Sequence, residues 1–180
     1  LPIGLIIYTG SFISYGIYEK FGSLFIFHTW FSLGITAIVF ILKSNTLLFT
    51  YLAIISISIS DTLAYEFGRR YGKRKLIEHI SPNKTIEGLI AGLFSGTIAM
   101  FLNVILNTDT GPLIALIISF IFICFGVLGD LFVSKIKRSL SVKDASSLLP
   151  GHGGLLDRVD SYLLSFPVLL LFSQFSYLIP

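Results

Sequence analysis

The sequence predicts an all-α, polytopic membrane protein with about six transmembrane helices in a single domain, residues 1–180. Hydrophobic residues make up 54% of the chain and charged residues only 13%, whereas roughly a quarter is usual in soluble domains. The mean hydropathy is +0.86. Six stretches carry no Asp, Glu, Lys or Arg, and each approaches or exceeds the roughly 17 residues that a membrane-spanning helix needs: residues 1–18, 21–42, 44–60, 88–108, 110–129 and 161–180.

Each stretch is interpreted as a helix because backbone groups in lipid must be hydrogen-bonded internally. The strand-length alternation of a membrane barrel is not sustained anywhere. Residues 1–18 lack the basic start and small-residue cleavage site of a signal peptide. The chain begins at Leu1, and we expect further N-terminal helices ahead of it. Cys124 is the only cysteine, which excludes an internal disulfide and a cysteine-ligated metal site.

Basic residues gather in two segments between predicted helices, residues 67–87 and 130–160. Together these loops hold 11 of the 13 Lys and Arg residues, and only Lys43 opposes the pattern. Two helices separate the loops, so both lie on one side, and the positive-inside rule makes that side cytoplasmic. This topology and attraction to anionic lipid headgroups explain the net charge of +3. No basic–aromatic groove accompanies the charge, so we expect no nucleic-acid partner.

Two aspartates lie where the predicted third and fifth helices reach the cytoplasm, Asp61 and Asp130. Ionisable groups at membrane depth are costly and usually mark a site or an ion pathway. The carbonyl ends of these helices suit a metal ion, and the amide ends of the fourth and sixth suit phosphate. The alternative for either aspartate alone is an interfacial residue that reaches water. Helical spacing places small or polar residues on the same helix face as each aspartate. The face of Asp61 also carries Ser58, Tyr65 and Gly68, and the face of Asp130 also carries Gly126, Ser134, Lys137 and Ser141.

The connection over residues 134–160 has the composition of a phosphate-binding loop. Cations alternate with hydroxyl side chains and are followed by Pro150-Gly151-His152-Gly153-Gly154. The glycines let backbone amides approach an anion closely. Asp157 and Asp160 follow, three residues apart on one face at the start of the last helix. Capping of that helix is an alternative role for either aspartate.

Residues 134–160 resemble the sequence pattern of the phosphatidate cytidylyltransferase family. A second block, residues 61–65, 68–73 and 80–88, resembles the upstream region of the same family, and the resemblance covers about residues 46–180. Asn83 stands where the family has a lysine, and Ala145 where a serine is common. The positions that match in the first block are Ser134, Ile136, Lys137, Arg138, Lys143, Asp144, Ser146, Leu149, Pro150, His152, Gly153, Gly154, Leu155, Asp157, Arg158, Val159 and Asp160.

The resemblance implies an enzyme that makes CDP-diacylglycerol and diphosphate from CTP and phosphatidic acid. It implies a multi-pass protein of the inner membrane with its active site toward the cytoplasm, a homodimer, and Mg²⁺ held by Asp130 and Asp157 with K⁺ beside it. His152 either contacts a phosphate or supports the loop. The expected catalytic residues are Asp130, Lys137, Arg138, Lys143, Asp144, His152, Asp157 and Asp160, and the expected substrate contacts are Asp61, Lys84, Ser134, Gly153, Gly154 and Arg158.

Other functions fit parts of the pattern. A CTP-dependent polyprenol kinase or an archaeal-type CDP-lipid synthase shares related membrane motifs, but neither is expected to match His152-Gly153-Gly154 so fully. The D-G-x-x-A-R motif of the CDP-alcohol phosphotransferases is absent. A transporter or channel also buries carboxylates in helices, although it has no need of a long loop suited to phosphate.

Overall fold

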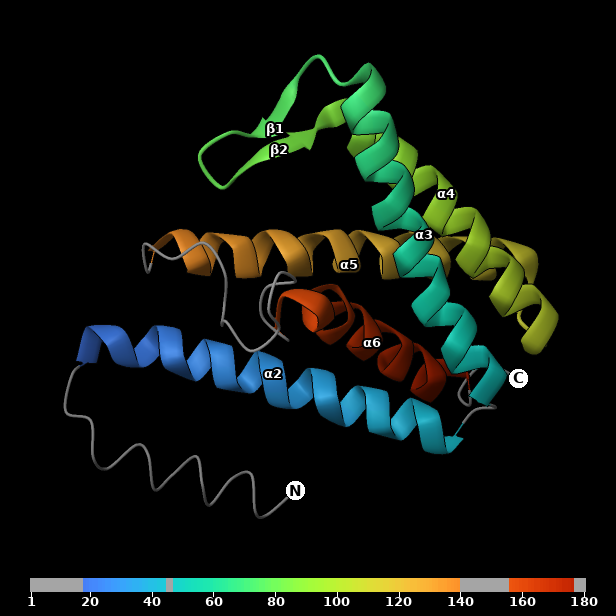
Figure 1. Cartoon of the computed structure of the whole chain (residues 1–180). Helices are drawn as coiled ribbons and strands as arrows, with labels where there is room; N and C mark the ends of the chain where they lie inside the picture. Colours follow the sequence, from blue (N-terminus) through green and yellow to red (C-terminus); the bar gives the residue numbers. More distant parts are fainter. Residues whose placement is uncertain (1–17, 45–46, 140–155, 177–180) are drawn as a thin grey trace.

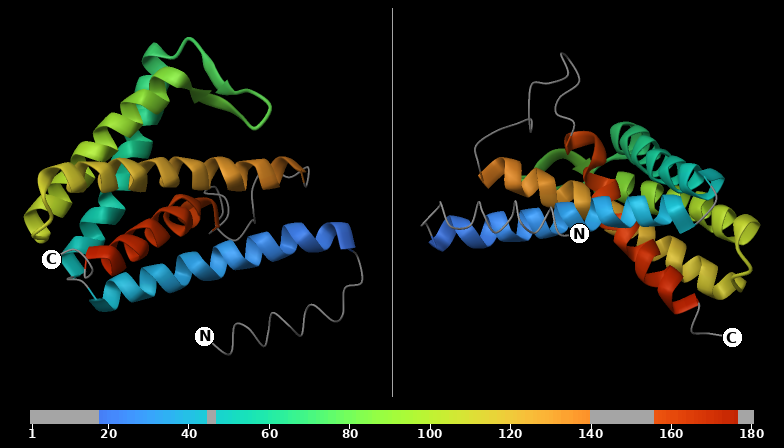
Figure 2. Two further views of the ribbon diagram at one scale, coloured as in Figure 1. Left: turned by 180° about the vertical axis from the view of Figure 1, so that it is seen from behind. Right: turned by 90° about the horizontal axis from the view of Figure 1, so that it is seen from below.

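A computed structural model of the chain describes residues 18–44, 47–139 and 156–176. Helices α3 and α4 run side by side to a β-hairpin, α5 crosses them, and α6 lies between α5 and α2 (Figures 1 and 2). The elements in chain order are α2 (Tyr18–Ser44), α3 (Leu47–Tyr71), β1 (Lys75–Ile77), β2 (Ser81–Thr85), α4 (Ile86–Asn107), α5 (Pro112–Ser139) and α6 (Leu156–Ser176).

Three helices of the described ranges are long and apolar enough to cross a membrane: Leu47–Tyr71, Ile86–Asn107 and Pro112–Arg138. Two shorter apolar helices, His28–Lys43 and Val159–Phe172, belong to α2 and α6. Large apolar side chains are exposed along the outer faces, as expected where lipid is the solvent; Leu106 is 77% exposed and Phe94 70%. These features confirm a multi-pass membrane protein. The helix expected at residues 1–18 lies outside the described residues.

The structure corrects the two predicted loops. Within residues 67–87, α3 continues to Tyr71, and β1 and β2 then pair as an antiparallel hairpin, which the all-α prediction omitted. Helix α5 likewise continues to Ser139. Asp61 and Asp130 therefore lie inside helices and not at their carbonyl ends. The physical reason is that charges mark where a helix leaves the hydrocarbon, and the helical hydrogen bonding continues beyond that point.

The close contact between α3 and α4 depends on three glycines of α4. Gly88, Gly92 and Gly96 recur every four residues and therefore share one helix face. A Cβ atom at Gly92 would lie 2.8 Å from both the Ala64 Cβ and the Ser60 backbone oxygen, and one at Gly96 would lie 2.7 Å from the Ser60 Cβ. Small residues at such positions let membrane helices approach backbone to backbone. This contact brings the polar part of α3 against the start of α4.

Helix α6 packs between α2 and α5. It contacts α2 where a Cβ at Gly34 would lie 2.5 Å from the Leu163 oxygen, and α5 where a Cβ at Gly129 would lie 2.5 Å from the Asp160 oxygen. Phe166 packs edge-to-face on Phe122, with ring centroids 5.8 Å apart, inside the main core. The glycine contact on α5 places Asp160 directly beside the residue that precedes Asp130.

Candidate active site

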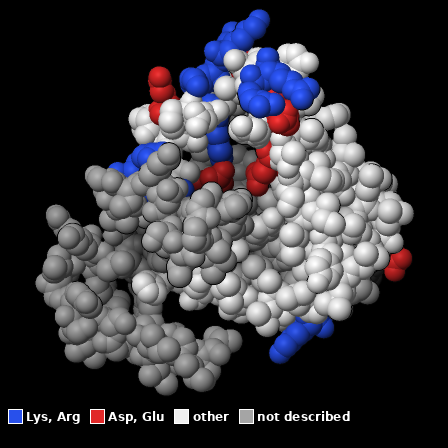
Figure 3. Space-filling model, in the orientation of Figure 1, with Lys and Arg blue, Asp and Glu red and all other residues white. Residues whose placement is uncertain are grey.

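A polar cavity of about 380 Å³ opens beneath the hairpin, between α3, α4 and α5. Basic side chains gather over the hairpin and the end of α3, and acidic side chains lie in a hollow below them (Figure 3). The cavity thus brings charges of both signs to one end of the helices. Its lining consists of Ser60, Asp61, Ala64, Tyr65, Leu76, Ser81, Asn83, Lys84, Thr85, Gly88, Leu89, Gly92, Val127 and Asp130.

An ion pair between Lys84 and Asp130 joins the hairpin to α5 across this cavity. The Lys84 Nζ donates to Asp130 Oδ2, and Ser134 Oγ donates to Asp130 Oδ1 at 3.4 Å. The two charged side chains are 32% and 28% exposed, so water screens their attraction only in part. Asp130 is therefore held in place on both oxygens by the hairpin and by its own helix.

Two further carboxylates surround this pair. Asp61 of α3 and Asp160 of α6 both interact electrostatically with Asp130, and Lys84 acts on both of them. Asp160 is only 5% exposed, and its Oδ1 accepts a hydrogen bond of 2.8 Å from the Ser161 amide. Carboxylates from α3, α5 and α6 thus all interact with the same lysine, Lys84. Such an arrangement favours a bound cation, because unneutralised carboxylates repel one another.

The hairpin that carries Lys84 is fixed at its base. Glu87 accepts hydrogen bonds from the backbone amides of Lys73 at 3.1 Å and Arg74 at 3.3 Å. Thr85 caps α4 by accepting from the Gly88 amide at 3.1 Å. The sequence-based prediction missed Glu87 and Thr85, although a threonine ahead of an acidic first turn is a helix-start signal. These contacts determine where Lys84 enters the cavity.

The structure brings five of the predicted site residues together: Asp61, Lys84, Asp130, Ser134 and Asp160. Lys137 also belongs to this group, because its charge acts on Asp160.

Arg138 points elsewhere, since its Nε donates to the Ile80 carbonyl of the hairpin at 3.2 Å. Asp157 and Arg158 have helical backbone in the first turn of α6, but their side chains lie outside the described residues. Also outside them are Lys143, Asp144, His152, Gly153 and Gly154.

Among the side chains that the structure describes, no group of three or more His, Cys, Asp or Glu residues is arranged to hold a metal ion. Mg²⁺ does not require such a cage, because it is usually bound by one or two carboxylates together with substrate phosphates. The oxygen donors of this cavity fit that chemistry. Asp157 precedes Asp160 by three residues in α6, so the two positions share a helix face.

Comparison with known proteins places the chain in a family. Residues 4–176 match the cytidylyltransferase family. The chain is 45% identical over 130 residues to the phosphatidate cytidylyltransferase of Staphylococcus aureus (strain COL), and 42% identical over 128 residues to that of Staphylococcus saprophyticus. Each alignment covers 71% of this chain and 49% of the relative, so the chain spans about half the length of the curated relatives it matches.

A solved structure described as an intramembrane enzyme for archaeal membrane lipid biosynthesis is also similar. It shares 23% identity, with a TM-score of 0.47, over 66% of this chain and 76% of the other. The family match covers nearly the whole sequence and includes every described residue of the polar cavity. It confirms the resemblance found in the sequence: the chain belongs to the cytidylyltransferase family.

Proposed function

We propose that this chain carries the site at which the cytidylyl group of CTP is transferred to phosphatidate, giving CDP-diacylglycerol and diphosphate. The observation that supports this proposal is the convergence of Asp61, Asp130 and Lys84 in one cavity, with Asp160 close enough to interact electrostatically with Asp130 and Lys84. The names of the relatives support the choice of substrates. The cavity lies at the end of the helices where most cations gather, which we assign to the cytoplasmic side of the inner membrane.

The reaction needs no nucleophilic side chain. An oxygen of the lipid phosphate attacks the α-phosphorus of CTP, and the bond from that phosphorus to the oxygen bridging the α- and β-phosphates breaks. The bridging oxygen leaves with the electron pair as part of diphosphate. Catalysis of this kind depends on positioning and on stabilising negative charge. Lys84 and Lys137 supply positive charge, and Ser134 keeps Asp130 oriented.

Mg²⁺ is part of the proposal, held by Asp130 and Asp157. When bound, the ion would neutralise phosphate charge and orient the nucleotide. Asp61 and Asp160 lie close enough to Asp130 to adjust the charge of that site. A K⁺ ion beside it and a homodimer are further expectations that follow from the resemblance.

The test is conversion of labelled CTP into a lipid-soluble CDP product, with phosphatidate and Mg²⁺, by the detergent-solubilised chain. Asp130→Asn and Asp157→Asn keep the size of the side chain and remove its charge. Turnover should fall roughly 10²–10³-fold in each, a typical effect of removing one preorganised electrostatic group. Asp109→Asn, on the exposed turn between α4 and α5, is the control and should be unaffected.

Absence of any CDP-lipid in the unsubstituted chain would contradict the proposed function of this chain. Near-normal turnover in Asp157→Asn, with unchanged dependence on Mg²⁺, would instead contradict only the metal assignment. Asp61 and Asp160 would then become the pair of carboxylates to test.

A further inference from the structure

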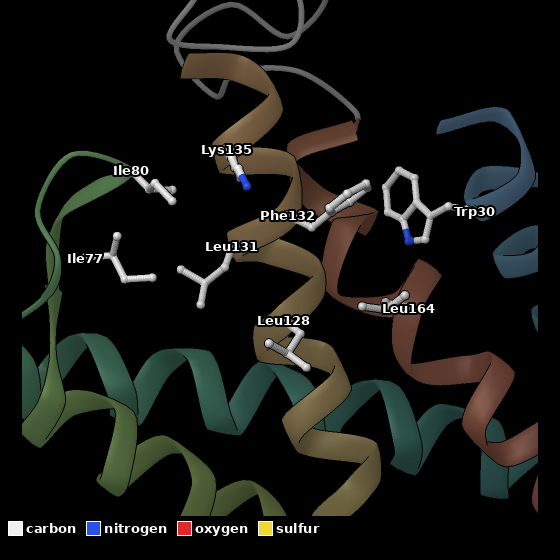
Figure 4. Close-up of a pocket in the computed structure, with 8 residues that line it drawn as sticks. All are labelled: Trp30, Ile77, Ile80, Leu128, Leu131, Phe132, Lys135 and Leu164. Atoms are coloured by element: carbon white, nitrogen blue, oxygen red, sulfur yellow. The ribbon is translucent and has the colours of Figure 1, made fainter. Parts of the chain in front are cut away.

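A second cavity, of about 500 Å³, adjoins the hairpin on its apolar side. Its size lies within the range of roughly 300–1,000 Å³ that is usual for ligand sites. Figure 4 shows the hairpin residues on one side, α5 in the middle, and residues of α6 and α2 on the other side. We call it the apolar groove, and it is lined by Trp30, Ile77, Ile80, Leu128, Leu131, Phe132, Lys135 and Leu164.

The apolar groove and the polar cavity share a wall. In β1, Leu76 lines the polar cavity and its neighbour Ile77 lines the groove, because successive strand residues point to opposite faces. On α5, Asp130 lines the polar cavity and Leu131 lines the groove. One hairpin and one helix therefore separate a charged compartment from an apolar one.

The groove is not wholly apolar, because Lys135 is the one charged residue among the lining residues that the structure describes. Its side chain reaches toward the space between the hairpin isoleucines and Phe132 (Figure 4). Arg138 lies three residues further along α5 and bonds the Ile80 carbonyl, so a second cation lies at the hairpin edge of the groove. Lys135 also directly follows Ser134, which donates to Asp130. Positive charge thus lies on the hairpin side of the groove, about one turn of α5 beyond Leu131.

We propose that the apolar groove holds one acyl chain of phosphatidate, with the lipid phosphate bound at Lys135. This inference rests on the proposed function and deepens it by assigning the lipid substrate to particular residues. The occupant follows from charge complementarity: the seven apolar side chains of the described lining suit a hydrocarbon chain, and the one cation described there suits an anionic headgroup. A phosphate monoester carries up to two negative charges near neutral pH, whereas a diester carries one. From this position the lipid phosphate lies five residues along α5 from Asp130, which lines the polar cavity.

The single tryptophan of the chain provides the test, because Trp30 lines the groove and is 7% exposed. Bromine on an acyl chain quenches tryptophan fluorescence only at short range. The chain, solubilised in detergent and without CTP, is titrated with brominated phosphatidate, phosphatidylglycerol or phosphatidylcholine. We expect saturable quenching at the lowest concentration for phosphatidate, reversed by the unbrominated lipid.

Lys135→Gln removes the proposed headgroup contact and keeps an exposed, polar side chain. A charge-assisted contact of ordinary strength predicts that the half-saturating concentration of phosphatidate rises roughly tenfold or more. Lys43→Gln removes a charge near the far end of α2 and is the matched control, which should leave the titration unchanged. Circular dichroism checks that both variants are folded.

Equal, unsaturable quenching by all three lipids would show bulk lipid contact and overturn the groove as a site. Equal saturable binding of phosphatidylglycerol and phosphatidate, or no effect of Lys135→Gln, would overturn the assignment of the phosphate monoester. The result is separable from that of the proposed function, since quenching needs no turnover. CDP-lipid formation without saturable quenching would overturn the lipid site in the groove and leave the proposed function intact. Saturable quenching without CDP-lipid formation would support the lipid site and contradict the proposed function.

Discussion

Replacement of Lys84 by Met tests the ion pair on which the proposed site depends. Methionine keeps the length of the side chain and removes the charge that meets Asp130. Exposed ion pairs contribute about 0–1 kcal/mol to folding, and breaking a fully buried pair costs about 3–5 kcal/mol. Because these side chains are 32% and 28% exposed, solvent screening places the cost near the lower range, at about 1 kcal/mol. The folded protein should therefore survive the change.

The effect on activity should be larger than the effect on stability. If Lys84 bonds a phosphate of CTP during transfer, its removal costs about 1.5–3 kcal/mol, or roughly 10–150-fold in kcat/KM. Lys75→Met is the matched control, since Lys75 is on the same hairpin but bonds the Pro82 carbonyl at 2.6 Å, outside the polar cavity. The assays are CDP-lipid formation and thermal unfolding in detergent. Equal losses of activity in the two variants would refute a specific role for Lys84.

Three other changes test topology, packing and hairpin anchorage. A cysteine at Lys75, in a Cys124→Ala background, should react with an impermeant thiol reagent only after cells are permeabilised; labelling of intact cells would contradict the cytoplasmic assignment. Gly92→Ala places a Cβ against the backbone of α3 and should lower stability by about 1–3 kcal/mol, whereas Gly111→Ala, with open space, should be neutral in thermal unfolding. Glu87→Ala should speed hydrogen exchange at the Lys73 and Arg74 amides, which directly precede β1; unchanged exchange would contradict the anchoring role.

The charged residues of the polar cavity could be selected from the sequence, but their arrangement could not. Asp61 and Asp130 were identified because carboxylates are rare in apolar helices, and that signal needs no structure. The pairing of Lys84 with Asp130 depends on a hairpin whose first strand has only three residues. A segment so short and so charged carries no clear alternation of apolar and polar residues. The prediction therefore treated it as a loop.

Arg138 is a second residue whose contacts could not be predicted from the sequence. The family resemblance implies a catalytic role at the phosphates for both Arg138 and Lys137. The two residues are adjacent in α5 and therefore point about 100° apart around the helix axis. Lys137 acts on Asp160, and Arg138 bonds the hairpin instead. The charge of a loop can be read from the sequence, whereas the compartment that each cation faces depends on where the helix ends.

The hairpin accounts for both proposals together. Lys84 enters the polar cavity from β2, and Ile77 and Ile80 contribute to the apolar groove. Glu87 holds the base of the hairpin by accepting from two backbone amides that precede β1, and the charged and apolar faces belong to that one hairpin. Transfer of the cytidylyl group requires the lipid phosphate and the α-phosphate of CTP to be held at a defined distance and angle. Small errors in their positions lower the reaction rate strongly. A single anchored hairpin that lines both cavities meets that requirement more directly than two independent loops, because its two faces are fixed to the same pair of hydrogen-bonded strands.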